Sequence, residues 1–121
     1  MDPHFDGVIF HTHAAELHRR LAHAHPPHRV LDVRPRGEYE AGHIPGAVSV
    51  PAGDAAGLGT ALPAGTEAYV VAADPWDPAA ETASRTLLAA GARRVVVLTG
   101  GMEEWRARGL PVESRPGQAA A

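Results

Sequence analysis

The sequence predicts an α/β protein in three layers, with a central, mainly parallel sheet of about five strands and helices on both faces. Short uncharged runs rich in valine and leucine alternate along the chain with stretches of helical periodicity. The links between these segments are short, which is typical of parallel strands connected by covering helices. The length of 121 residues suits one domain. We assign residues 1–113 to that domain and 114–121 to a frayed tail.

The first half of the chain is expected to contain three strands and one helix. Thr12 is a candidate N-cap for a helix over residues 13–25, with an apolar face formed by Ala14, Leu17, Leu21 and Ala24. Prolines 26 and 27 then end this helix. The apolar runs predict strands over 8–10, 30–33 and 47–50, with a helical turn over 37–41.

The second half is expected to supply two further strands, each followed by a helix. Residues 51–66 are read as a loop with a turn of helix, before a strand over 69–73. Asp77 as N-cap and Pro78 at the first helical position begin a helix that continues to Ala90 and ends at Gly91. A strand over 95–98 and a helix over 102–108 complete the predicted elements.

Charge and hydropathy exclude several classes of partner. The eleven basic residues are all arginine, and fourteen acidic residues give a net charge of −3, which argues against a basic face for nucleic acid. No apolar run approaches the roughly 20 residues that span a bilayer, and the first residues lack the pattern of a secretory signal. We therefore expect a cytoplasmic protein with no membrane or nucleic-acid partner.

The chain contains no cysteine. Its absence excludes disulfides, thiolate nucleophiles and cysteine metal sites within this sequence. No pattern indicates a cofactor, and we expect none.

Two segments together resemble the signatures of rhodanese-like domains. Residues 31–48 read LDVRPRGEYEAGHIPGAV, and residues 98–105 read LTGGMEEW. The resemblance extends over residues 8–113, and the first motif is the more specific of the two. It implies a compact three-layer domain with a central parallel sheet.

The resemblance also implies where the active site of a catalytic member would lie. In such members a cysteine ends the fourth strand and begins a loop like C-x-x-G-x-R, and its thiolate carries sulfur as a persulfide. The loop's backbone N–H groups hold the anionic group, and related phosphatases use a loop one residue longer. Here the equivalent segment is 72–80, with Ala73, Asp74 or Pro75 in the place of the nucleophile. The chain therefore resembles a variant that lacks the catalytic cysteine.

The rest of this loop is also unsuited to an anion. Pro75 and Pro78 each lack an N–H group, while Asp74 and Asp77 place negative charge near the position of thiosulfate or phosphate. We therefore predict a degenerate active-site loop over Asp74, Pro75, Trp76, Asp77 and Pro78, inactive as a sulfurtransferase. The expected role is a binding or regulatory module, not an enzyme, for an unidentified protein partner or small ligand.

Four residues near this loop are candidates for binding: Trp76, Arg34, Arg36 and His43. Trp76 can either project as an aromatic contact or fold into the vacated pocket, and we favour the folded position. For Arg34 we favour pairing with Asp32, Glu38 or Asp74 over a binding role. His43 belongs to the GHIPGA turn, where we favour a structural role.

Two other functions stay open as alternatives. The first is an enzyme related to thiosulfate sulfurtransferases or phosphatases, with altered chemistry through Asp74 as nucleophile, or a sulfur-handling role that uses a partner's thiol. The second is a histidine-rich metal-binding module. Its candidate ligands are His11, His13, His23, His25 and His28, although no interleaved carboxylate or cysteine completes a ligand set.

Overall fold

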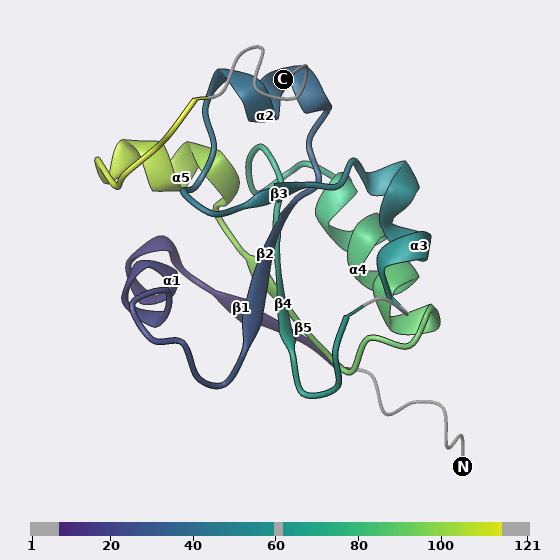
Figure 1. The fold of residues 1–121 in the computed structure, drawn as a ribbon. Helices are drawn as coiled ribbons and strands as arrows, with labels where there is room; N and C mark the ends of the chain where they lie inside the picture. Colours follow the sequence, from purple (N-terminus) through teal and green to yellow (C-terminus); the bar gives the residue numbers. More distant parts are fainter. Residues whose placement is uncertain (1–7, 60–61, 115–121) are drawn as a thin grey trace.

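A five-stranded sheet, parallel throughout, forms the centre of the computed structural model, which describes residues 8–59 and 62–114 (Figure 1). The strands are β1 (Val8–Thr12), β2 (His28–Asp32), β3 (Val48–Ser49), β4 (Glu67–Val71) and β5 (Arg94–Leu98). They lie in the order β1-β5-β4-β2-β3. The predicted fold class is therefore confirmed.

Helices cover both faces of the sheet (Figure 1). One face packs against α1 (Ala14–Arg20) and α5 (Gly101–Ala107), and the other against α3 (Ala55–Gly59) and α4 (Ala79–Ala89). The helix α2 (Arg36–Ala41) follows β2, and the 3₁₀ helix η1 (Ala52–Asp54) precedes α3. The proposed tail over 114–121 falls outside the described residues except for Ser114.

The uncharged strands supply two apolar cores because successive side chains of a strand point to opposite faces. In β5, Val95 and Val97 belong to the cluster that includes Leu87 of α4. The alternate residues of the same strand, Val96 and Leu98, belong to the cluster around Trp105 of α5. This double burial explains why the strand reads as a continuous apolar run.

Helix α1 is shorter than the predicted helix over 13–25. It ends at Arg20, and Thr12 is the last residue of β1 instead of a helix cap. The Arg20 guanidinium donates hydrogen bonds to the carbonyl oxygens of His23 and Pro26, which holds a turn where we expected helix. Ala24, assigned to the apolar face, is exposed in this turn.

Strand β4 ends at Val71, two residues before the predicted end at position 73. The carbonyl oxygens of Ala72 and Ala73 leave the sheet and accept the N–H groups of Met102 and Glu103, both at 2.9 Å. These two donors belong to the first turn of α5, where backbone N–H groups lack partners within the helix. The start of α5 therefore sets the point where β4 becomes a loop.

The other predicted elements differ from the structure by one or two residues at their ends, the usual uncertainty of helix and strand boundaries. Residues 51–66 contain η1 and α3, in line with the expected turn of helix. Among the described residues, every helix is too short or too polar to cross a membrane.

Candidate functional site

The loop after β4 lies where the fold can form a binding site. It leaves the carboxyl end of β4, and α4, which follows it, packs on one face of the sheet, while α5, which follows the adjacent β5, packs on the other. Ligands of open α/β sheets bind in the crevice where neighbouring connections diverge in this way. The chain thus places residues 72–78 at the position that the family resemblance implies.

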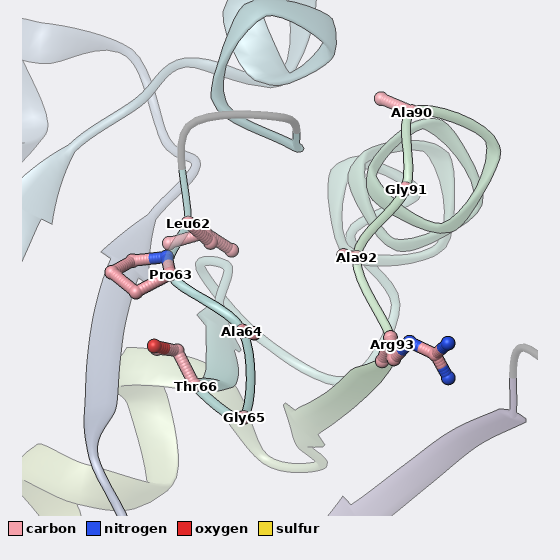
Figure 2. A pocket seen from close by; sticks show the side chains of 9 residues that line it. All are labelled: Leu62, Pro63, Ala64, Gly65, Thr66, Ala90, Gly91, Ala92 and Arg93. Carbon is pink, nitrogen blue, oxygen red and sulfur yellow. The ribbon is translucent and has the colours of Figure 1, made fainter.

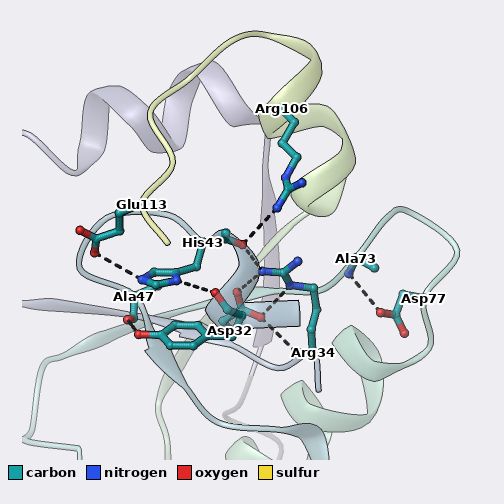
Figure 3. A network of polar contacts seen from close by, with 10 residues as sticks. Asp32, Arg34, His43, Ala47, Ala73, Asp77, Arg106 and Glu113 are labelled. Carbon is teal, nitrogen blue, oxygen red and sulfur yellow. Dashed lines mark hydrogen bonds and ion pairs between the residues drawn. The ribbon is translucent and has the colours of Figure 1, made fainter. Parts of the chain in front are cut away.

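Asp77 is the central acceptor of this loop. One carboxylate oxygen accepts the N–H of Ala73 and the other accepts the N–H of Ala79, each at 3.0 Å. Asp77 therefore caps α4 through its side chain as predicted, with Pro78 next in the chain. The bond to Ala73 also holds the first part of the loop close to the start of α4 (Figure 3). Both carboxylate oxygens of Asp77 are thus occupied by backbone N–H groups of residues at the two ends of the loop.

Asp74 makes a local turn. Its carboxylate accepts the N–H of Trp76 at 2.9 Å, and its carbonyl oxygen accepts the N–H of Asp77 at 3.2 Å. This is the Asx-turn pattern that aspartates adopt in loops. The bond gives Asp74 a structural role, and a nucleophilic role stays a prediction without further support.

Trp76 does not fold into the site, so the favoured position was wrong. Its side chain is 86% exposed. The Asp74 turn fixes the backbone at Trp76, while Gly101 packs so closely behind the loop that a Cβ there would lie 2.7 Å from the carbonyl oxygen of Ala72. The indole projects from this turn into solvent.

Arg34 lies inside the protein, in the network of Figure 3, and pairs with Asp32, one of the three partners that the sequence left open. Its Nε and one terminal nitrogen contact the two carboxylate oxygens at 2.9 and 2.7 Å. The same terminal nitrogen donates to the carbonyl oxygen of Gly42 at 2.7 Å, which ties the end of α2 to β2. At 4% exposure, Arg34 offers no binding surface, and its binding candidacy is corrected to a structural role.

His43 is also buried, with 0% exposure, so its binding candidacy is corrected in the same way. Its ring stacks on Tyr39 at 3.8 Å between centroids, and Nδ1 lies 2.6 Å from the carbonyl oxygen of Tyr39. Because a carbonyl oxygen only accepts, Nδ1 carries the proton. Nε2 lies 3.4 Å from a carboxylate oxygen of Glu113 (Figure 3), and two backbone hydrogen bonds of 2.9 Å between His43 and Glu113 hold the segment after α5.

Arg36 is exposed at the start of α2. The four binding candidates are therefore not one surface. Arg34 and His43 belong to a buried network around Gly42, whereas Trp76 and Arg36 face solvent.

The metal candidates are dispersed. His11 lies in β1 and His28 in β2, and two other strands, β5 and β4, separate them in the sheet. Neighbouring strands are about 4.8 Å apart, which puts these two imidazoles too far apart to share an ion. His23 and His25 lie in the exposed turn after α1. Within the described ranges, no three histidine, aspartate or glutamate side chains gather as a metal site.

Two pockets border the sheet at opposite ends. At the carboxyl end, a groove of about 500 Å³ runs between the 74–78 loop, the start of α4 and the strands β1 and β5. At the amino end, a pocket of about 330 Å³ is lined by residues 62–66 and 90–93 (Figure 2). Arg93 is the charged residue of that second pocket, and its guanidinium points away from the 62–66 segment (Figure 2). Of these two pockets, the groove at the carboxyl end therefore has more ionisable side chains in its lining.

The sequence analysis missed the part of the groove outside the loop. His11, Thr99 and Glu81 line it together with the loop residues. Glu81 lies in the first turn of α4, four positions after Asp77, and this closeness in the sequence was a usable signal. His11 and Thr99 become neighbours because β1 pairs with β5, where Thr12 is opposite Leu98.

The amino end of the sheet holds the groups with shifted pKa values. Burial would raise the pKa of Glu67, but hydrogen bonds from Tyr69 and Arg20 hold it below its usual value. Burial also raises the pKa of Tyr69 and lowers that of His28, which lies beside Arg20. Arg94 adds a contact of 3.1 Å to Glu67. This network joins α1 to β4 and β5, away from the loop.

Comparisons with known proteins agree with this arrangement. Over 84 residues, the chain is 39% identical to "HTH-type transcriptional regulator Rv0324" of Mycobacterium tuberculosis, covering 69% of this chain and 37% of that protein. Over 76 residues, it is 34% identical to "Putative sulfur carrier protein YrkF" of Bacillus subtilis, covering 63% of this chain and 40% of that protein. The chain thus spans about two-fifths of the length of these relatives.

Solved structures carry the same fold. The Alr3790 protein from Anabaena sp. superposes with a TM-score of 0.78 at 32% sequence identity, over 90% of this chain and 98% of that one. The rhodanese-like domain family matches residues 13–108, most of the sequence. With its parallel sheet, its two motifs and its loop after β4, the chain belongs to the rhodanese-like domain family.

Proposed function

We propose that this chain is a rhodanese-like binding module that transfers no sulfur of its own. The observation that carries this proposal is the hydrogen bonding of the loop after β4. The N–H groups of Ala73 and Ala79 are both donated to the Asp77 carboxylate, and that of Trp76 to Asp74. In this proposal an internal carboxylate replaces the thiosulfate of a catalytic member, and the chain has no cysteine to accept its sulfur.

Electrostatics opposes the return of an external anion to this loop. Two like charges about 4 Å apart repel by about 1–4 kcal/mol in surroundings between water and a protein surface. Pro75 and Pro78 have no N–H groups to compensate. The loop is therefore better suited to a neutral or positively charged partner than to a sulfur donor.

The relatives support a modular role without naming its partner. One relative is named as a transcriptional regulator and the other as a putative sulfur carrier, and this chain matches a minor part of each. A domain of this family thus occurs within longer proteins that carry different names. We infer that the exposed loop serves as the contact surface of such a module.

A thiosulfate:cyanide assay tests the loss of catalysis. The folded chain, checked by circular dichroism, should form no thiocyanate above the buffer control, while a cysteine-containing rhodanese run in parallel should do so. Thiocyanate that increases with the concentration of this chain would contradict the proposal.

The Asp77→Ala variant tests why the loop rejects anions. Removing the carboxylate should release the N–H groups of Ala73 and Ala79, so their amide NMR signals should shift on titration with sulfate or thiosulfate. Loss of the cap should also lower the free energy of unfolding by about 1–2 kcal/mol. Asp54→Ala, which removes the same charge from an exposed site in η1, is the matched control. If the amide NMR signals of Ala73 and Ala79 shift equally in wild type and Asp77→Ala on titration with the anion, Asp77 is not what keeps anions from the loop.

A further inference from the structure

The groove beside the loop combines an apolar floor with an acidic rim. Ile9 of β1 and Val97 of β5 supply apolar surface, and the 74–78 loop and the start of α4 form the opposite wall. The rim carries the carboxylates of Asp74, Asp77 and Glu81, and no arginine belongs to the lining. The groove therefore has the charge opposite to that of a sulfurtransferase anion pocket.

The three carboxylates are neutralised to different degrees. Asp77 uses both oxygens on backbone N–H groups. Asp74 uses one oxygen on the N–H of Trp76, and within the described residues no hydrogen bond reaches its other oxygen. Glu81 pairs with Arg85 at 2.8 Å, but both side chains are mostly exposed, and such surface pairs are weak. Asp74 and Glu81 can therefore accept hydrogen bonds from a cationic ligand.

Trp76 adds an aromatic face at the same rim. The indole is highly exposed and lines the groove. Phe10 of β1 offers a contrast, because the Arg94 guanidinium already covers its ring at 4.1 Å. In the described part of the chain, no arginine covers Trp76 in this way. Tryptophan is the aromatic side chain best suited to hold a guanidinium by cation–π attraction.

Strand β1 supplies the backbone beside this rim. It ends the sheet and, among the described residues, pairs with β5 alone. Its sequence VIFHT contains no proline or acidic residue to discourage pairing. Ile9 and His11 face the groove, so an extended segment added beside β1 would present every second side chain to the same face.

We propose that this groove binds the arginine side chains of an extended basic segment of a partner protein that lies along β1. The partner's guanidinium stacks on Trp76 and donates to Asp74 and Glu81, while its backbone pairs with the free edge of β1. This inference rests on the proposed function, because it names the chemistry of the partner that the binding module takes.

Tryptophan fluorescence provides a direct assay. Trp105, the other tryptophan, is buried, so a change on titration reports on Trp76. A short blocked peptide of alternating arginine and valine should change the fluorescence at micromolar to millimolar concentration. The matched peptide with glutamate in place of arginine should produce no change. Equal responses to both peptides would overturn the proposal.

Charge variants then locate the site by isothermal titration calorimetry. Asp74→Asn and Glu81→Gln should each weaken binding of the arginine peptide about two- to five-fold, in the range of single exposed ion pairs. Trp76→Ala should weaken it by a similar factor. Glu38→Gln on α2, outside the groove, is the charge-matched control and should leave affinity unchanged. Unchanged affinity in Asp74→Asn, Glu81→Gln and Trp76→Ala would overturn the assignment.

The pairing of the peptide backbone with β1 can be tested separately. The bound peptide should slow amide hydrogen exchange in β1 and shift the NMR signals of its residues. If N-acetylarginine amide alone binds as tightly as the peptide, or β1 signals do not move, the pairing along β1 is refuted. Failure of the peptide to bind, with no thiocyanate formed by the chain, would refute this inference and leave the loss of catalysis intact. Thiocyanate formation would instead refute the proposed function itself.

Discussion

Two neighbouring segments at the carboxyl edge of the sheet neutralise their carboxylates in different ways. After β2, the Asp32 carboxylate is paired with the Arg34 side chain at 2.9 and 2.7 Å, and it also accepts the Arg34 backbone N–H at 3.1 Å. After the adjacent β4, Asp77 is paired with backbone N–H groups of its own loop, both at 3.0 Å. The first segment belongs to the motif over residues 31–48, and the second is the loop that we propose as a binding surface.

This difference indicates that the segment after β2 mainly stabilises the fold, whereas the segment after β4 mainly determines what the loop binds. The Arg34 guanidinium also bonds the carbonyl oxygen of Gly42, so this pair connects β2 to the far end of α2. The bonds of Asp77 stay within seven residues of chain and mainly shape the loop. Substitutions in the first segment should therefore damage the fold, whereas those in the second should change what the loop binds.

Among these substitutions, Arg34→Met should cause the largest loss of stability. It leaves the buried Asp32 carboxylate without its charged partner, and removal of one member of a buried ion pair costs about 3–5 kcal/mol. Urea unfolding should show a loss of this size. Arg36→Met, two residues along and exposed, should change the free energy of unfolding by less than about 0.5 kcal/mol. Similar losses in the two variants would remove the distinction.

The Gly101→Ala variant tests how much the close packing of Gly101 against residues 72–74 contributes to stability. Gly101 has a φ of +62°, and an added Cβ would lie 2.7 Å from both the Ala72 carbonyl oxygen and the Asp74 nitrogen. A left-handed conformation costs a non-glycine residue about 1–2 kcal/mol, and the clash adds to it, so we expect a loss of about 2 kcal/mol or more.

Gly46→Ala is the control for this substitution. Gly46 has a φ of +86° but no atom within 4 Å of the added Cβ, so it reports the conformational cost alone. A loss in Gly101→Ala no larger than that in Gly46→Ala would show that the close approach to the loop contributes nothing. Both are measured by urea unfolding.

Much of the fold could be predicted because its signals are local. The valine run of β5 and the Asp77-Pro78 start of α4 depend on neighbouring residues, and both are where the sequence places them within about one residue. The end of α1 could not be predicted, because the helical periodicity continues to Ala24. The bonds from Arg20 to two later carbonyl oxygens stop the helix, and these depend on the tertiary turn.

In the site, too, features that depend on neighbouring residues could be predicted, and features that depend on tertiary contacts could not. Pairing of Arg34 with Asp32 could be predicted from their spacing and charge, and it is observed. The exposure of Trp76 could not, because no local pattern decides whether a loop side chain is buried or exposed. The groove required the pairing of β1 with β5, segments more than eighty residues apart in the chain. Sequence motifs identified the loop but not the wall opposite it.

The smallest predicted effect concerns the amino edge, where the carboxylate of Glu67 is bound by side chains. Glu67 accepts hydrogen bonds from Tyr69 and Arg20 and contacts Arg94, so its side-chain contacts resemble those of Asp32 in a more exposed place. Glu67→Gln should lower the free energy of unfolding at neutral pH by about 1 kcal/mol or less, as for pairs near the surface.

This effect should depend on pH with a definite sign. Because the pKa of Glu67 is lowered in the folded protein, its stabilisation is complete above the unfolded value of 4.5 and is lost as the pH falls through the folded pKa. The gap between wild type and Glu67→Gln, measured as urea midpoints from pH 7 to pH 3, should therefore close in acid. Glu38→Gln, at an exposed position, should give no such closing gap.

The lowered pKa of His28 acts in the same direction at higher pH. Its neutral form is favoured in the folded protein, so stability is complete above 6.5 and declines as the pH falls through the folded pKa. In His28→Gln, the part of the pH dependence of the unfolding free energy that comes from His28 should disappear, while the part that comes from Glu67 should persist. If acid unfolding keeps its full slope in both variants, neither Glu67 nor His28 is responsible for it, and the assignment of the pH dependence to the amino edge is refuted.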